Sequence, residues 1–160
     1  MSDTNLLQRK SPVHLPLRAL HNRATIVLVT VCTDKRKRIL AHEDVHRLLI
    51  EAWNKADAWL VGRYVVLPDH IHLFCAPNQS DAPTLGSWVH FWKSLVSQRW
   101  PRPAEQPIWQ KSLWDTQLRE ADRYGDKWEY VRHNPVRHGL VTSPEQWVFQ
   151  GELHVLEWHD

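Results

Sequence analysis

Two histidines separated by one residue, His70 and His72, could hold a metal ion between them. Alternate residues of a β-strand point to the same face of the sheet, so a strand through this segment would place both imidazoles side by side. The pair alone is a weak signal, because eleven histidines in 160 residues produce roughly one such pair by chance. The context favours a metal site. The residues that alternate with the histidines are apolar, and Pro68-Asp69 places the pair at the start of the strand, where a site can be open.

A phenol and a carboxamide, from Tyr130 and Asn134, stand four residues apart in a segment that predicts a helix over Asp126–Asn134, stopped by Pro135. Residues four apart lie about one turn apart on the same helix face. The phenol is a candidate nucleophile and the amide oxygen a candidate metal ligand. By itself the spacing favours a plainer interpretation, a core tyrosine and an asparagine that ends the helix.

The segment His42-Glu-Asp-Val-His46 matches the H-E-x-x-H pattern of zinc peptidases. It is also typical of a helix start, since Glu43 and Asp44 would stabilise the positive end of the helix dipole. His42 would then lie at or before the N-cap, off the regular turn that the pattern requires, and no third ligand follows at a suitable spacing. A zinc metallopeptidase that uses His42 and His46 is therefore the least favoured alternative.

Hydrophobic periodicity predicts the elements that must position these side chains. Strands are predicted at Ala24–Thr33, Trp59–Leu67, His70–Ala76 and, as one strand or two pieces, Trp109–Leu118, with helices at Glu43–Ala58, from Thr84 through Val96, and at Asp126–Asn134. The helix at Asp126 is expected to start after Gly125, and Ser143-Pro-Glu-Gln146 resembles a capping box ahead of a short tail. This order predicts a single α+β domain over residues 1–160 with a mostly antiparallel sheet.

The composition is that of a globular domain, with 42% hydrophobic and 24% charged residues. No apolar run is long enough to span a bilayer, and residues 1–16 lack the apolar core of a signal peptide. We therefore expect a cytoplasmic protein with no membrane partner. Cys32 and Cys75 fall in predicted strands without a C-x-x-C pair, which excludes a zinc ribbon and fits a reducing compartment.

The net charge of +2 does not by itself indicate a nucleic-acid-binding protein, so any phosphate-binding surface must come from local clusters. The run Lys35-Arg36-Lys37-Arg38 is one such cluster, although it can equally be a solvated turn. Ten tryptophans are unusual. Trp88 and Trp92 have the spacing of core residues, whereas Trp109 and Trp114 could stack on an unpaired base.

Three blocks of the sequence, in order and spacing, resemble those of the REP-associated tyrosine transposases, relatives of the small single-strand insertion-sequence transposases. The first, Val65-Val-Leu-Pro-Asp-His-Ile-His-Leu-Phe74, looks like the HUH signature of single-tyrosine transposases. The second is Trp109-Gln110 with Trp114-Asp-Thr-Gln-Leu-Arg119, and the third is Trp128-Glu-Tyr-Val-Arg-His-Asn-Pro-Val-Arg-His-Gly-Leu-Val141. The resemblance runs from about Leu20 to near the C-terminus. Several linked blocks are far more specific than one His-x-His pair.

This resemblance implies a ferredoxin-like antiparallel sheet with helices packed on one face, the fold of HUH nucleases. It matches His70 and His72 to the metal-binding pair, Asn134 to the third ligand and Tyr130 to the nucleophile. The implied cofactor is a divalent cation, Mg²⁺ or Mn²⁺. An ordinary tyrosine is only about 0.1% ionised at neutral pH, a cost of roughly 4 kcal/mol, which a cation on the scissile phosphate can offset.

The resemblance also implies a substrate, single-stranded DNA with palindromic or hairpin elements, cut and rejoined through a 5′-phosphotyrosine link. The sequence departs from the family at Asp69, where many relatives have Asn, and at His138, where a small residue is common; neither change removes a catalytic group. A domesticated hairpin-binding protein that no longer cuts is the main alternative, and the intact candidate residues argue against it. Both a monomer and a homodimer fit, and in a dimer Tyr130 could act in trans.

Basic residues near the implied nucleophile are the better candidates for holding substrate phosphates. Arg132 and Arg137 flank the end of the predicted helix, and with Lys35, Arg36, Lys37 and Arg38 they are the expected DNA contacts. Lys127, one turn before Tyr130, is expected to face solvent.

Overall fold

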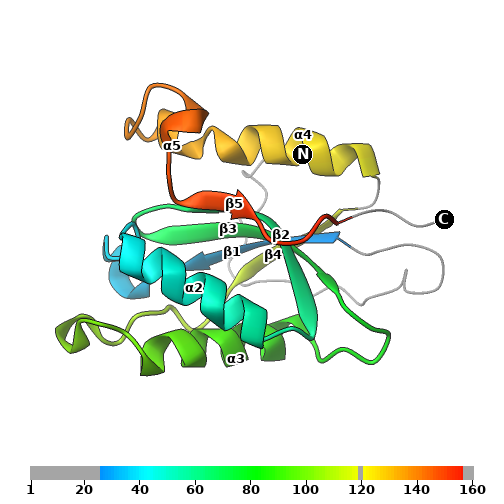
Figure 1. Cartoon of the computed structure of the whole chain (residues 1–160), viewed down its shortest axis with the longest axis horizontal. Coiled ribbons are helices and arrows are strands. Elements are labelled where there is room, and N and C mark those ends of the chain that lie inside the picture. The colour runs from blue at the N-terminus through cyan, green and yellow to red at the C-terminus, as the bar shows by residue number, and fades with distance from the viewer. Residues whose placement is uncertain (1–25, 119–120, 157–160) are drawn as a thin grey trace.

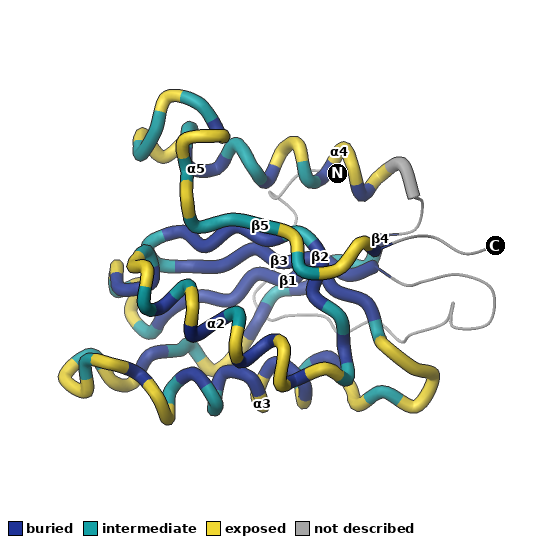
Figure 2. The backbone as a smooth tube through the Cα atoms, viewed as in Figure 1, coloured by how far each residue is buried: buried dark blue, intermediate teal, exposed yellow. Residues whose placement is uncertain are grey.

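A computed structural model describes residues 26–118 and 121–156 of the chain. In these ranges five strands form one antiparallel sheet in the order β4-β1-β3-β2-β5. The strands are β1 Ile26–Cys32, β2 Trp59–Val66, β3 His70–Pro77, β4 Trp114–Leu118 and β5 Gln150–Glu152. β3 is therefore paired on both sides, and every one of its residues before Pro77 is buried (Figure 2).

Helices cover both faces of this sheet (Figure 1). Helices α2 (Glu43–Lys55) and α3 (Leu85–Gln98) lie on one side of it, and α4 (Ala121–Arg132) lies on the other. A short helix, α5 (Asn134–Arg137), follows α4 almost directly. Single 3-10 turns occupy Asp34–Arg36, Pro103–Glu105 and Pro144–Gln146. None of the described helices is both long and apolar enough to cross a membrane.

The face under α2 and α3 holds the larger hydrophobic core, which is rich in tryptophan. Trp88 and Trp92 are one helical turn apart on α3 and almost fully buried. The Trp53 ring from α2 meets that of Trp92 edge-on at a centroid distance of 5.7 Å. The Trp88 indole donates a hydrogen bond of 2.6 Å to the carbonyl of Ala56. Both tryptophans are thus core residues, as their spacing predicts.

The opposite face holds a smaller core, formed by alternate residues of β1 and β3 with α4 and the chain near Leu156. Tyr124 of α4 is buried against Phe74 of β3, with ring centroids 4.8 Å apart. Its hydroxyl accepts a 3.0 Å hydrogen bond from the backbone N–H of Arg63 on β2. This contact attaches α4 to the sheet. His70 and His72 share a strand face with Phe74, so α4 and the histidines lie on the same side.

The observed class, α+β with an antiparallel sheet, confirms the prediction. The prediction that the helices pack on one face holds for α2 and α3, whereas α4 lies on the other face.

The predicted fourth strand is two pieces, because Trp109 forms an isolated bridge with Thr33 before β4. Ser143 and Gln146 form the predicted capping box, and the segment expected to be a short tail contains β5. Ala24 lies outside the described residues.

Both predicted ends of the helix expected at Asp126–Asn134 are wrong. α4 begins at Ala121, so Tyr124 and Gly125 lie inside it. The low helix propensity of glycine is overridden because Tyr124 and Val131 are buried on the sheet. α4 also ends at Arg132, and Asn134 is the first residue of α5, where Pro135 is favoured because it has no N–H to leave unpaired.

The close approach of α4 to β2 predicts that Gly62→Ala is destabilising. A Cβ at this position would lie 2.6 Å from the Tyr124 hydroxyl oxygen and 2.6 Å from Leu156 Cδ1. Such overpacking costs about 1–3 kcal/mol in the free energy of unfolding. Urea denaturation should show a loss of this size.

The matched control is Gly125→Ala, within α4. No described atom lies within 4 Å of the added methyl group, so this variant should gain about 0.5–1 kcal/mol from helix propensity. Equal effects of the two substitutions would contradict the close packing of α4 on β2.

Candidate active site

A cavity of about 420 Å³ gathers all four residues predicted for catalysis and metal binding. His70 and His72 enter it from β3, Tyr130 from the last turn of α4 and Asn134 from the start of α5. The sheet supplies the two imidazoles because alternate residues of β3 share one face. The cavity therefore forms where the α4–α5 junction passes over the first residues of β3.

The orientation of the His72 ring is fixed from β1. His72 pairs with Thr30 across the β1–β3 ladder, and the Thr30 hydroxyl is hydrogen-bonded to His72 Nδ1 at 2.8 Å. With Nδ1 engaged, Nε2 is the nitrogen left for a ligand. Burial holds the pKa of His72 well below its ordinary value, with smaller contributions from neighbouring cations. The ring is therefore neutral at neutral pH, the form in which imidazole binds metals.

The orientation of His70 is fixed by the residue before it. Asp69 Oδ1 lies 2.7 Å from His70 Nδ1, and Asp69 Oδ2 accepts a hydrogen bond of 3.1 Å from Arg36 Nε. The hydrogen bond with His70, the largest cause, holds the pKa of Asp69 far below its usual range despite partial burial. A carboxylate on the outer nitrogen of a histidine is the usual support for a metal-binding imidazole. Asp69, one of the departures from the family, is thus in position to give His70 this support.

The two imidazoles are spaced as ligands of one ion would be. Their ring centroids are 4.9 Å apart, with planes at 86°. A metal–nitrogen bond of about 2.1 Å puts two imidazole centroids roughly 4.5–5.3 Å apart at angles of 90–110° around the ion. Among the described residues, no three His, Cys, Asp or Glu side chains form a possible metal cluster. A third protein ligand would therefore come from another kind of group, such as an amide oxygen.

Asn134 can supply that amide. The side chain is 6% exposed, and its Nδ2 finds no hydrogen-bond partner in the described part of the chain. Its Oδ1 accepts one hydrogen bond, 3.0 Å from Arg137 Nη2, and keeps a second lone pair. The remaining lone pair of Oδ1 is the group that a cation would use, whereas the unpaired Nδ2 is a donor and would need an acceptor. The donor set of two imidazoles and one amide oxygen thus fits a divalent cation.

Tyr130 is accessible, with 41% of its surface exposed, in contrast to the other two tyrosines. The Arg137 guanidinium carbon lies 4.0 Å from the centroid of the Tyr130 ring. Tyr64 and Tyr124 are 2% and 7% exposed, and burial raises the pKa of each to about 12. Only Tyr130 presents a phenol to the cavity.

The predicted DNA-contacting residues of the basic turn differ in their surroundings. Arg36 lines the cavity and is paired with Asp69. Lys37 donates to the carbonyls of Glu105 and Pro107, both at 2.7 Å, so it fixes the loop. Lys35 and Arg38 are exposed, and their contact with DNA stays a prediction.

The arginines near the nucleophile are both engaged within the protein. Arg132 pairs with Glu129 and Glu145, each at 3.0 Å. Arg137 is held against Tyr130 and Asn134. Their expected role in holding substrate phosphates therefore stays a prediction. A phosphate would have to compete with these contacts within the protein. Lys127 is buried, 8% exposed, so its expected solvent-facing position is wrong.

Sequence reasoning missed Thr30 and Gln110, which also line the cavity. Both are placed by strand pairing with distant segments, a signal that no local pattern carries. Trp114, named as a possible stacking residue, lines the cavity as well. His138, noted only as a departure from the family, lies there too, with its ring centroid 6.0 Å from that of His70.

The zinc-peptidase pattern does not form a site. His42 is the N-cap of α2, with extended backbone angles, and is exposed. His46 Nε2 is instead hydrogen-bonded to the Tyr64 hydroxyl at 2.7 Å. Within the described ranges neither histidine belongs to a possible metal cluster. The pattern is therefore a helix start.

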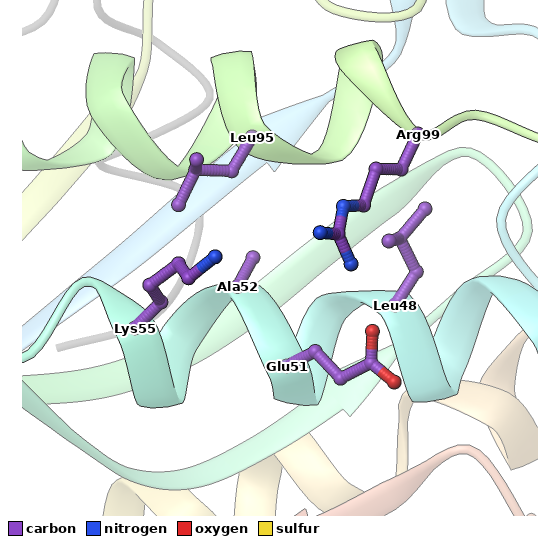
Figure 3. Close-up of a pocket in the computed structure, with 6 residues that line it drawn as sticks. All are labelled: Leu48, Glu51, Ala52, Lys55, Leu95 and Arg99. Atoms are coloured by element: carbon purple, nitrogen blue, oxygen red, sulfur yellow. The ribbon is translucent and has the colours of Figure 1, made fainter.

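A second pocket, of about 190 Å³, lies between α2 and α3 (Figure 3). Leu48, Ala52 and Leu95 form its apolar part, and charged side chains of α2 and of Arg99, which follows α3, lie around them. It contains no histidine, tyrosine or amide. The larger cavity is therefore the candidate active site.

The neutral state of His72 predicts a specific dependence of stability on pH. Because the folded-state pKa is lowered, the unfolded chain takes up a proton below about pH 6.5 that the folded chain does not. The stabilisation that comes from a neutral His72 is therefore fully present above that pH and is lost as the pH falls. A chelator should be present so that no metal ion is bound. Between pH 7 and 5 the free energy of unfolding of the wild type should then fall more steeply than that of His72→Gln, by up to about 1.4 kcal/mol per pH unit. Parallel curves would contradict a buried neutral imidazole.

The chain is similar in sequence to known proteins. The chain is 27% identical over 131 residues to the REP-associated tyrosine transposase of Escherichia coli K12, covering 81% of this chain and 70% of that protein. It is 25% identical over 111 residues to a proposed REP-associated tyrosine transposase of Haemophilus influenzae, covering 58% of this chain and 62% of that protein. No family model matches the chain.

Solved structures share the fold. A REP-associated tyrosine transposase bound to a REP hairpin aligns over 86% of this chain and 82% of its own, with a TM-score of 0.67 and 22% identity. A proposed transposase of Deinococcus radiodurans R1 aligns over 72% of this chain and 95% of its own, with a TM-score of 0.50 and 17% identity. The resemblance to REP-associated tyrosine transposases drawn from the three sequence blocks is thereby confirmed.

Proposed function

We propose that the chain is a DNA transposase that binds hairpin-forming single-stranded DNA and cuts and rejoins it through Tyr130. The observation that carries the proposal is the single cavity into which β3, α4 and α5 bring His70, His72, Tyr130 and Asn134. The similarity in sequence to REP-associated tyrosine transposases supports the same activity. A fold neighbour that was solved with a REP hairpin supports the choice of substrate.

In the proposed reaction the exposed phenol of Tyr130 is the nucleophile. The Tyr130 oxygen forms a bond to the scissile phosphorus as the bond from phosphorus to the 3′-oxygen breaks. The phenol gives up its proton, and the released 3′-oxygen takes one up. The product is a 5′-phosphotyrosine link and a free 3′-hydroxyl. Because one phosphoester replaces another, a second 3′-hydroxyl can reverse the step without a further energy source.

His70, His72 and Asn134 are the residues that would hold a divalent cation, Mg²⁺ or Mn²⁺. Such an ion, when bound, polarises the phosphoryl group. The protein's own contribution is orientation. Thr30 and Asp69 each engage the Nδ1 of one imidazole, so both rings are fixed before any ligand arrives.

Tyr130→Phe should abolish covalent attachment to DNA while leaving the fold intact, since only an exposed hydroxyl is lost. The measurement is a denaturing gel of protein incubated with Mn²⁺ and hairpin DNA labelled downstream of the cut. Wild type should form a protein–DNA adduct and Tyr130→Phe none.

Tyr64→Phe is the matched control, because its hydroxyl is hydrogen-bonded to His46 in the core on the other face of the sheet, and the adduct should persist. An adduct of wild-type yield in Tyr130→Phe would remove Tyr130 from the reaction. Hairpin binding by the wild type without any adduct would support the alternative of a non-cleaving binding protein.

The cation site is tested by a pair of histidine variants. His70→Ala should weaken Mn²⁺ binding by at least tenfold, measured by calorimetry or by the electron paramagnetic resonance of free Mn²⁺. His42→Ala should leave it unchanged, since His42 lies at the start of α2. Hairpin affinity should survive both changes, because phosphate contacts come mainly from other residues. The opposite pattern would assign the metal to the H-E-x-x-H segment.

A further inference from the structure

One guanidinium group contacts both the candidate nucleophile and the candidate amide ligand. Arg137 Nη2 donates to the backbone carbonyl of Tyr130 at 2.8 Å and to Asn134 Oδ1 at 3.0 Å. The guanidinium also lies over the Tyr130 ring, 4.0 Å from its centroid, well inside the 6 Å range of a cation–π contact. Three contacts on two candidate active-site residues converge on this one side chain.

These contacts cross a break between two helices. Tyr130 is on α4, which ends at Arg132, and Asn134 opens α5. The relative position of the two side chains is therefore not set by the geometry of one helix. Arg137, the last residue of α5, reaches back across the break and bonds to both sides of it.

The backbone that carries Arg137 is itself well fixed. Gly139 follows α5 two residues after Arg137, and its φ of +71° is readily available only to glycine. The N–H of Gly139 donates to the carbonyl of Val136, and that of Leu140 donates to the carbonyl of Pro135. These bonds close the helix with a glycine C-cap, so the arginine starts from a defined position.

We propose that Arg137 is a positioning residue that fixes the Tyr130 phenol relative to the Asn134 amide oxygen. The inference rests on the proposed function and adds to it the group that sets the alignment of nucleophile and ligand. Lysine cannot replace it, because a single ammonium group offers neither the planar face nor the fork of donors. The competing role, a phosphate contact as expected from the sequence, predicts different results.

A structural test uses the small number of tyrosines. Protein labelled with 3-fluorotyrosine has three ¹⁹F resonances, from Tyr64, Tyr124 and Tyr130, and Tyr130→Phe identifies the third. Arg137→Met and Arg137→Lys should both move the Tyr130 resonance and leave the other two in place. Arg132→Met, which breaks pairs with Glu129 and Glu145 on the same surface, is the control and should leave it unmoved. An unmoved Tyr130 resonance in both Arg137 variants would overturn the proposal.

A functional test separates positioning from phosphate binding. At saturating hairpin DNA, both Arg137 variants should lower the single-turnover rate of adduct formation by about 10- to 100-fold, as small misplacements of reacting groups do. The dissociation constant for the hairpin and its dependence on salt should stay at wild-type values.

The opposite result identifies a phosphate contact. In that case Arg137→Met would weaken hairpin binding and reduce the slope of log affinity against log salt concentration by about one, whereas Arg137→Lys would retain the wild-type affinity and slope. This outcome overturns the proposal. If the wild type forms no adduct, the proposed function fails, while the ¹⁹F spectra still decide whether Arg137 positions Tyr130.

Discussion

The pairing of β1 with β3 is the constraint on which the candidate site depends. This register sets Thr30 opposite His72 and Cys32 opposite His70. A shift of one residue would turn both imidazoles into the tryptophan-rich core and expose Ile71 on the other face. The hydrophobic face of β3 thus fixes the position of the polar one. Because β3 is buried on both faces, its histidines need hydrogen-bond partners, and Thr30 and Asp69 supply them.

The second requirement is a helix on the histidine side of the sheet. Gly62 allows Tyr124 to approach β2, where the Tyr124 hydroxyl binds the Arg63 backbone. This attachment lies in the first half of α4, and the last turn of the helix then carries Tyr130 over the start of β3. The exposed nucleophile therefore has a buried anchor on its own helix, so an accessible group can occupy a defined place.

The sequence predicted the parts of this arrangement that depend on local pattern. Strand alternation placed His70 and His72 on one face, and helical spacing identified the buried tryptophans of α3. Gly125 was wrongly taken as a helix boundary, since its low propensity matters less than the burial of Tyr124 on the sheet. Asn134 was placed on the tyrosine helix, although α4 stops two residues earlier. The contacts of Thr30 and Arg137 depend on register and on a helix break, and neither can be derived from residue spacing alone.

The charges around the cavity explain how a chain with a net charge of only +2 could bind a polyanion. Arg36 lines the cavity, and the Asp69 carboxylate beside it is paired with Arg36 and His70. Neighbouring cations lower the pKa of His72 further, after the larger effect of burial, so positive charge reaches the site despite the Asp69 carboxylate. The local potential is thus set by a few residues and favours an anionic ligand such as a phosphate. The net charge of the whole chain includes the rest of the surface and therefore does not indicate this local positive potential.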